Sequence, residues 1–314
     1  MKKIKIPNTD LEVSNLCFGT SSLGTSTKGK DADRLISEFV ESGGCFFDTA
    51  HCYSFWVENG LGASERELGT CLKRLGYWDD VIVATKGGHP DGGAGYRRPD
   101  RYISESIIKS DISESLDRLG TDRIDLYFLH RDDQRVPVAE IMDILNNEIE
   151  IGRLRYIGAS NWSIERIAEA NDYASKNGLQ SFVASQVQWS LATPNWEIGI
   201  DPTMRYVTKA DAEFYEKSKM PIIAYSSTAG GYFSGKDAGF DNAPNRERFR
   251  RASELAQRLG YTATQIALAY LMNQEACVIP IFRTSNSEHL REIMASADIS
   301  LENNQIRWLS NAEY

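Results

Sequence analysis

The stretch SESIIKSDISESLDRLGTDRIDLYFLH, residues 104–130, places a helix pattern directly before a strand pattern. Five aliphatic residues of the first part fall on one helical face: Ile107, Ile108, Ile112, Leu116 and Leu119. Gly120 is well placed to end that helix. The second part, DLYFLH, is apolar without alternation, as in a parallel-sheet strand that is covered on both faces. The stretch therefore predicts one repeat of an α/β fold.

The same alternation runs through the whole sequence. Seven further strand-like runs occupy residues 16–19, 45–48, 81–85, 156–160, 182–186, 221–226 and 277–281. Amphipathic segments lie between them, as in 32–42, 138–150, 163–178 and 287–296. Eight such units without a linker predict an α/β fold with one domain over residues 1–314, a single (β/α)8 TIM barrel with a parallel eight-stranded core.

A doubly wound open sheet is the alternative architecture. Its dinucleotide-binding form requires GxGxxG directly after the first strand. The first strand is followed here by GTSSLGT, residues 19–25, which has a different spacing. The barrel is therefore the preferred prediction.

Composition narrows the class of protein. A net charge of -9 argues against binding to nucleic acid or to an anionic membrane surface. No apolar stretch approaches the ~20 residues that span a bilayer, and the first residues do not resemble a secretory signal. The five cysteines are scattered and contain no CxxC pair, which is typical of free thiols in a reducing cytoplasm. We therefore expect a cytoplasmic protein.

Polar residues end nearly every predicted strand. The active site of a (β/α)8 barrel is built at the carboxyl ends of its strands. The residues there are Asp48, Lys86, His130, Ser160, Asn161, Gln186, Tyr225, Ser226 and Arg283. Any one of them alone is more often a solvated rim residue. Their shared position indicates an active site.

Four residues make chemical sense as a group. A tyrosine has an unperturbed pKa of ~10, and a neighbouring ammonium would lower it, so we expect Lys86 to lower the pKa of Tyr53. Asp48 would pair with Lys86 and hold it in place. His130 would donate a hydrogen bond to a substrate oxygen. The group has no source of hydride, which a cofactor must therefore supply.

These residues carry a resemblance to the aldo-keto reductase superfamily. Asp48 and Tyr53 in DTAHCY, Lys86 in VIVATKGG and His130 in IDLYFLH resemble its Asp, Tyr, Lys and His tetrad. The phrases SERELG (residues 64–69) and GRLRYIGASNW (residues 152–162) also look like family signatures. The resemblance implies a carbonyl reductase or alcohol dehydrogenase in which hydride passes between nicotinamide C4 and the substrate carbon. Tyr53 would exchange the proton with the substrate oxygen.

The resemblance also implies a cofactor site. Gly19, Thr20 and Ser21 would lie beneath the cofactor, and Ser160, Asn161 and Gln186 would hold the nicotinamide carboxamide. Tyr225 would stack on the nicotinamide ring, and the loop from Ser226 and Ser227 to Gly230 would cover the pyrophosphate. Arg283, Thr284 and Ser285 would contact a ribose 2'-phosphate, with His289 and Glu292 near the adenosine end. NADP(H) is the expected cofactor, and NAD(H) is the alternative because His289 stands where the family often carries arginine.

Two long loops are expected at the mouth of the barrel, residues 54–63 and 196–211. The polar and aromatic residues expected to contact the substrate are His51, Trp56, Arg131 and Asp132. Such a lining suits a sugar or another polyhydroxylated carbonyl, because an aromatic face packs on C–H groups while polar side chains bind hydroxyls. The alternative is that these loop charges are merely solvated.

Two other functions are alternatives for this sequence. Some barrels of this superfamily bind nicotinamide cofactors and serve as regulatory subunits of membrane channels, with little catalysis. A metal-dependent hydrolase would use His51, Asp48 and His130, but four histidines without an HxH pair make poor ligand geometry, so no metal is expected. The sequence leaves the oligomeric state open.

Overall fold

The structure, a computed structural model, describes residues 1–195, 201, 203–236 and 239–310. Eight parallel strands form a closed barrel in the order β10-β3-β4-β5-β6-β7-β8-β9. Their bounds are β3 Cys17–Gly19, β4 Phe46–Asp48, β5 Ile82–Gly87, β6 Ile124–Leu129, β7 Leu154–Ser160, β8 Ser185–Gln188, β9 Ile222–Tyr225 and β10 Val278–Phe282. Each overlaps one of the eight predicted runs. The predicted parallel (β/α)8 barrel is therefore confirmed.

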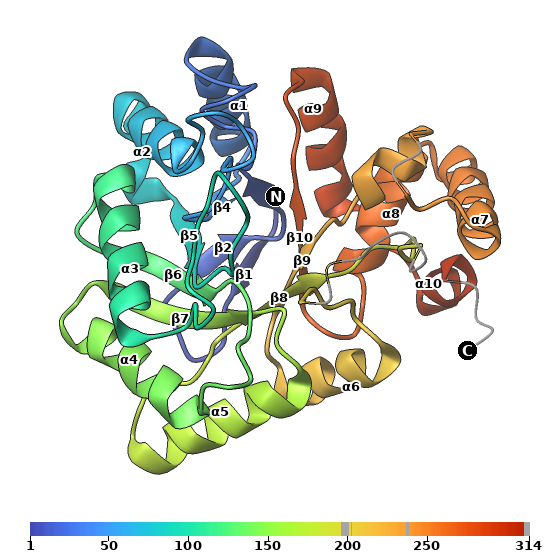
Figure 1. Cartoon of the computed structure of the whole chain (residues 1–314). Coiled ribbons are helices and arrows are strands. Elements are labelled where there is room, and N and C mark those ends of the chain that lie inside the picture. Colours follow the sequence, from blue (N-terminus) through green and yellow to red (C-terminus); the bar gives the residue numbers. More distant parts are fainter. Residues whose placement is uncertain (196–200, 202, 237–238, 311–314) are drawn as a thin grey trace.

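Helices surround the strands (Figure 1). Their bounds are α1 Lys30–Glu41, α2 Ala63–Leu75, α3 Glu105–Leu119, α4 Val138–Glu150, α5 Ile164–Asn177, α6 Lys209–Ser218, α7 Ala243–Leu259, α8 Ala263–Met272, α9 Ser287–Ala295 and α10 Asn303–Leu309. Short 3-10 helices occupy η1 Trp78–Asp80, η2 Ala229–Ser234 and η3 Ser296–Asp298. The five predicted helices correspond to α1, α3, α4, α5 and α9.

A short antiparallel hairpin precedes the barrel and was not predicted. It consists of β1 Lys3–Lys5 and β2 Glu12–Ser14. Ile6, Leu11 and Val13 are buried in one cluster with inward-facing strand residues such as Phe46 and Phe128. The hairpin therefore contributes apolar side chains to the barrel core, far in sequence from most of the residues that it covers.

The register of the strands brings the predicted site residues to one rim. Asp48 pairs with Gly19 on one side and with Ala84 on the other. Ser160 pairs with Gln186 on the neighbouring strand. Because all eight strands are parallel, their carboxyl ends meet at the same end of the barrel, as expected for the active site of this fold.

No helix within the described ranges is long and apolar enough to cross a membrane. All five cysteines are free thiols, as predicted.

Candidate active site

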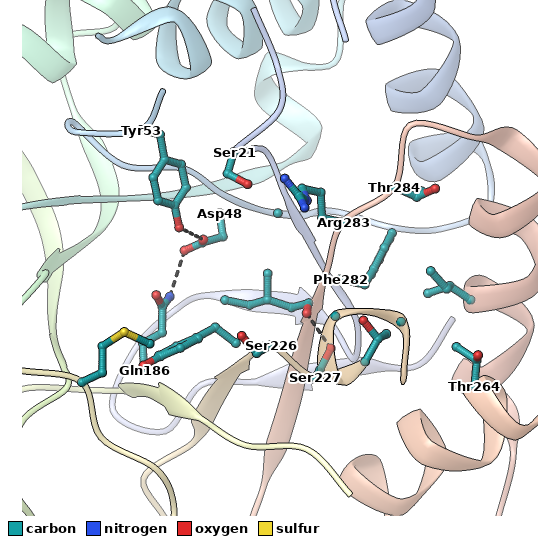
Figure 2. Close-up of a pocket in the computed structure, with 18 of the residues that line it drawn as sticks. Ser21, Asp48, Tyr53, Gln186, Ser226, Ser227, Thr264, Phe282, Arg283 and Thr284 are labelled. Atoms are coloured by element: carbon teal, nitrogen blue, oxygen red, sulfur yellow. Dashed lines mark hydrogen bonds between the residues drawn. The ribbon is translucent and has the colours of Figure 1, made fainter. Parts of the chain in front are cut away.

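A cavity of about 540 Å³ opens at the carboxyl ends of the strands. Figure 2 shows Tyr53, Asp48 and Gln186 at one end and Thr284 and Thr264 at the other, with Ser226, Ser227 and Phe282 between them. The volume lies in the range of small-molecule and cofactor sites. The cavity is elongated, which suits a ligand with a reactive group at one end and an anchoring group at the other.

Two of the predicted catalytic side chains, Asp48 and Tyr53, contact the ammonium group of a third, Lys86. Lys86 Nζ donates to Asp48 Oδ2 at 2.8 Å, to the Tyr53 hydroxyl at 2.9 Å and to the Thr49 carbonyl at 2.6 Å. The Lys86 side chain is only 1% exposed, and it lies beneath the cavity surface. Gln186 Nε2 donates to the other carboxylate oxygen, Asp48 Oδ1, at 2.8 Å. Each of the three N–H groups of the buried ammonium thus has an acceptor. These hydrogen bonds offset the cost of removing the ammonium from water.

The Tyr53 hydroxyl is held between opposite charges. It lies 3.3 Å from Asp48 Oδ2, to which it donates, and it accepts from Lys86. Burial, and after it the negative charge of Asp48, raises the pKa of Tyr53 well above its ordinary value. The expectation that Lys86 would lower this pKa was wrong in direction, because it left out desolvation of the ring. The phenol therefore keeps its proton at neutral pH.

His130 follows β6 and lines the same cavity as Tyr53, with the two rings 6.0 Å apart. Burial, and then the nearby charge of Arg131, lowers the pKa of His130 well below its ordinary value. The imidazole is therefore neutral at neutral pH, with one N–H to donate and one nitrogen to accept. Its Nδ1 lies 3.4 Å from the Cys52 thiol sulfur.

Most residues predicted to bind a cofactor line the cavity. Those that do are Gly19, Ser21, Ser160, Asn161, Gln186, Tyr225, Ser226, Ser227, Arg283, Thr284, His289 and Glu292. Thr20 and Ser285 do not. Thr20 is fully buried and its hydroxyl donates to the Asp48 carbonyl, so it supports the strand end rather than facing a ligand.

Asn161, one of the expected carboxamide contacts, already has partners at both ends of its amide. Asn161 Oδ1 accepts from the Tyr225 hydroxyl at 2.7 Å and from the Arg205 backbone at 3.1 Å. Asn161 Nδ2 donates to the His130 carbonyl and to the Ser160 hydroxyl. Asn161 can therefore bind a carboxamide only if one of these internal hydrogen bonds is replaced. Gln186 lines the cavity, and its Oε1 accepts no hydrogen bond from the described residues, so it can accept from such a group without exchange of partners.

The loop after β9 has an unusual backbone. Ser226, Ala229, Gly230 and Gly231 have positive φ values of 53°, 50°, 64° and 93°. Closely spaced left-handed residues can turn backbone N–H groups toward one point and form an anion-binding concavity. Lys236, which is exposed and lines the same cavity, adds a positive charge. This end of the cavity therefore suits a phosphorylated ligand.

Of the predicted substrate contacts, Trp56 and Arg131 line the cavity. The Trp56 residue is 57% exposed, as expected for a mouth residue. Arg131 is buried and its guanidinium donates to Thr203 Oγ1 at 2.8 Å, in the segment after β8. Residues 196–200 and 202 of the predicted mouth loop 196–211 lie outside the described residues.

The structure places His51 away from the cavity, which corrects its predicted role. Its Nε2 lies 3.0 Å from Glu114 Oε2 and its Nδ1 lies 3.2 Å from the Tyr96 hydroxyl. The residue is 1% exposed, with Asp111 also nearby. His51 thus belongs to a buried polar network against α3. It is not aimed at a substrate or at a metal shared with Asp48.

Asp132 also turns away from the cavity. Its carboxylate accepts from Arg166 Nε, with both oxygens at 3.3 Å, and it does not line the cavity. An ion pair with a residue of α5 explains its position. The substrate role predicted for Asp132 is therefore withdrawn.

Several lining residues were missed from the sequence. They are Met204, Gly231, Ser234, Lys236, Thr264, Ile281 and Phe282. Ile281 ends the predicted last strand and Phe282 follows it directly, so both could have been found. Met204 and Thr264 come from a loop and from the start of a helix, where the sequence carries no chemical signal.

The chain is similar to known proteins over nearly its whole length. The uncharacterized oxidoreductase YrpG of Bacillus subtilis (strain 168) is 30% identical over 324 residues, covering 99% of this chain and 95% of that protein. Norsolorinic acid reductase A of Aspergillus parasiticus is 28% identical over 329 residues, covering 99% of this chain and 80% of that protein. Probable aldo-keto reductase 1 of Glycine max is 28% identical over 336 residues, covering 99% of this chain and 89% of that protein.

A solved structure shares the fold. A thermostable aldo-keto reductase in complex with the inhibitor epalrestat superposes with a TM-score of 0.75 at 23% identity, covering 99% of both chains. The model of the aldo/keto reductase family matches residues 15–313. The chain therefore belongs to the aldo/keto reductase family of oxidoreductases.

Proposed function

We propose that the protein interconverts a carbonyl and an alcohol with a nicotinamide cofactor, preferably NADP(H). The observation that carries this proposal is the contact of Lys86 with both Tyr53 and Asp48 beside a cavity that His130 also lines. A proton donor and a second polar group then face the same space, where a substrate oxygen can lie between them.

Different side chains would protonate and orient the substrate oxygen. Tyr53 holds a proton at neutral pH and gives it to the developing alkoxide, while Lys86 stabilises the phenolate that remains. Neutral His130 donates a hydrogen bond that orients the carbonyl. The bound cofactor supplies the hydride. Asp48 and Gln186 fix the ammonium from the other side, so that it stays below the phenol.

The phosphate end of the cavity supports NADP(H) as the preferred cofactor. Arg283 is exposed, lines the cavity and makes no ion pair with any residue in the described ranges. A guanidinium of this kind is suited to a phosphate because it presents paired N–H groups. Glu292 is less available, because its carboxylate accepts from the Thr262 hydroxyl at 2.6 Å.

A sugar or another polyhydroxylated carbonyl remains the proposed substrate class. Trp56 offers an aromatic face at the mouth and Arg131 offers donors within it, which together suit hydroxyl-bearing carbon. His51 and Asp132 do not line the cavity, so it offers a substrate fewer polar contacts than the sequence predicted.

The experiment is a substrate panel of aromatic aldehydes, ketones, aldoses and ketoses. Each is assayed with NADPH and with NADH by the absorbance of the reduced nicotinamide. Turnover of sugars with NADPH supports the full proposal, and turnover of simple aldehydes alone refutes the sugar class. Tight binding of NADPH with no turnover of any carbonyl would refute the catalytic proposal and favour a regulatory subunit.

A further inference from the structure

Three potential metal ligands lie together beside the tetrad. Cys52, His89 and His130 each bring one ligand atom to within 4.8 Å of the other two. Cys52 and His130 are buried, and His89 is partly buried. The three come from the loop after β4, the loop after β5 and the end of β6. None of the contacts that hold Asp48, Lys86 and Tyr53 together uses Cys52 or His89.

The spacing is close to that of a coordinated ion. Zinc bonds of ≈ 2.3 Å to sulfur and ≈ 2.0–2.1 Å to nitrogen place neighbouring ligand atoms of a tetrahedron roughly 3.3–3.6 Å apart. The Cys52 sulfur lies 3.4 Å from His130 Nδ1. The remaining separations, which are within 4.8 Å, need to shorten by at most about 1.5 Å to match that tetrahedral spacing.

His89 is oriented as a ligand. Its Nδ1 lies 2.8 Å from the Pro90 carbonyl, to which it can only donate, so the Nε2 lone pair is left free. A backbone carbonyl on the other ring nitrogen is the usual partner of a metal-binding histidine, because it fixes the tautomer. The His89 and His130 rings pack edge to face with centroids 4.8 Å apart, so a small rotation of either ring changes their ligand geometry.

We propose that Cys52, His89 and His130 form a binding site for a borderline-soft divalent cation such as Zn²⁺. Two imidazoles and one sulfur leave a fourth position for water, as in zinc sites with three protein ligands. On binding, the Cys52 S–H bond breaks, the sulfur–metal bond forms and the proton passes to solvent. Burial raises the pKa of the Cys52 thiol to about 12, and the nearby positive charges of Lys86 and Arg131 repel a cation, so the site is weaker than a structural zinc site.

The consequence is inhibition. The ion and its fourth ligand would lie against the His130 ring, which lines the cavity. They would change both the charge and the space beside the substrate oxygen that His130 orients. The site is therefore a point at which Zn²⁺ switches the protein off reversibly, and it is not part of the reaction itself.

Metal binding is tested directly with Co²⁺ as a spectroscopic probe and with Zn²⁺ as a competitor. The whole chain is titrated with Co²⁺, and the sulfur-to-cobalt charge-transfer absorption reports a cysteine ligand. We expect this band in the wild type, its loss in Cys52→Ser, at least tenfold weaker binding in His89→Gln, and displacement of Co²⁺ by Zn²⁺.

Two variants control for ligands elsewhere on the chain. Cys71→Ser removes another buried thiol and His289→Gln removes an exposed histidine, and both should keep the band. Circular dichroism checks that every variant is folded. Absence of the band in folded wild type, or its persistence in Cys52→Ser, would overturn the proposal. This readout needs no turnover, so it stands apart from the test of the proposed function.

Inhibition of carbonyl turnover by Zn²⁺ provides a second test. If the carbonyl assay gives turnover, Zn²⁺ should suppress it, a chelator should restore it, and His89→Gln should resist suppression. Equal suppression of His89→Gln and wild type would place the inhibitory ion elsewhere and overturn the proposed consequence.

Discussion

The ammonium nitrogen of Lys86 lies 2.9 Å from the Tyr53 hydroxyl and 4.5 Å from the centre of the same ring. One buried cation therefore contacts both the phenol oxygen and the aromatic face. The negative charge that balances it, Asp48, lies 2.8 Å away on the neighbouring strand. This arrangement has consequences for stability, for pH dependence and for catalysis.

Removal of the balancing charge should destabilise the fold. Asp48→Ala leaves the Lys86 ammonium buried and unpaired, and we expect a loss of roughly 3–5 kcal/mol in the free energy of unfolding. The double variant Asp48→Ala with Lys86→Met should recover much of that loss, because no charge then remains to be solvated. Urea unfolding measures both, and a single variant as stable as wild type would contradict the buried pair.

The rate of carbonyl reduction should change little between about pH 6.5 and 9. Tyr53, whose pKa is raised, keeps its proton as the pH rises, and His130, whose pKa is lowered, stays neutral as the pH falls. Neither group therefore changes its protonation state inside that window. Steady-state kcat against pH checks this, and a fall in kcat above about pH 8 would indicate a tyrosine with a lowered pKa.

Protonation of His89 should destabilise the protein in mild acid. Burial, and then the charge of Arg131, lowers the pKa of His89 from 6.5 to about 4. Between these pH values the unfolded chain binds the proton more strongly, so the stability contributed at pH 7 is lost as the pH falls from about 6.5 to 4. The difference corresponds to roughly 3 kcal/mol in the free energy of unfolding.

His89→Gln removes this titration, so its stability should fall less than that of wild type between pH 7 and 4. The exposed His289→Gln is the matched control and should follow the wild-type profile. Denaturant unfolding at several pH values makes the comparison. Parallel profiles for wild type and His89→Gln would refute the contribution of His89.

The choice between NADP(H) and NAD(H) should depend on Arg283. Arg283→Ala removes a cation from the cavity, and we expect NADPH to bind roughly 10- to 100-fold more weakly, with NADH nearly unaffected. Arg291→Ala is a suitable control, because Arg291 is exposed and lies 3.6 Å from Glu38. Dissociation constants follow from quenching of tryptophan fluorescence. Equal weakening for both cofactors would argue against a 2'-phosphate contact.

The sequence predicted the barrel and the tetrad because both depend on local patterns. An apolar run such as residues 126–129 must be buried on both faces, and the residue that follows it must then lie on the rim. Asp48, Lys86 and His130 follow from that rule alone. Tyr53 does not follow from that rule, because it lies in a loop whose path no local pattern determines. It was assigned from the chemistry of a phenol beside an ammonium and from the resemblance.

The errors concern the direction of side chains on those loops. His51 is two residues from Tyr53, yet its ring points to Glu114 and Asp111 on α3. Asp132 is two residues from His130, yet it pairs with Arg166. In both cases the partner is more than 30 residues away, so only the folded structure shows which way the side chain turns. The N-terminal hairpin was missed for the same reason. It stabilises the fold through contacts with residues that are far from it in the sequence.

The central claim is that Tyr53 gives the proton to the substrate oxygen, and Tyr53→Phe tests it most directly. Within the described residues, the Tyr53 hydroxyl forms hydrogen bonds only with Lys86 and Asp48. Its removal should therefore leave the barrel folded. We predict that kcat for carbonyl reduction falls roughly 10²- to 10⁴-fold while the dissociation constant for NADPH changes less than about threefold. A variant with wild-type kcat would contradict the account.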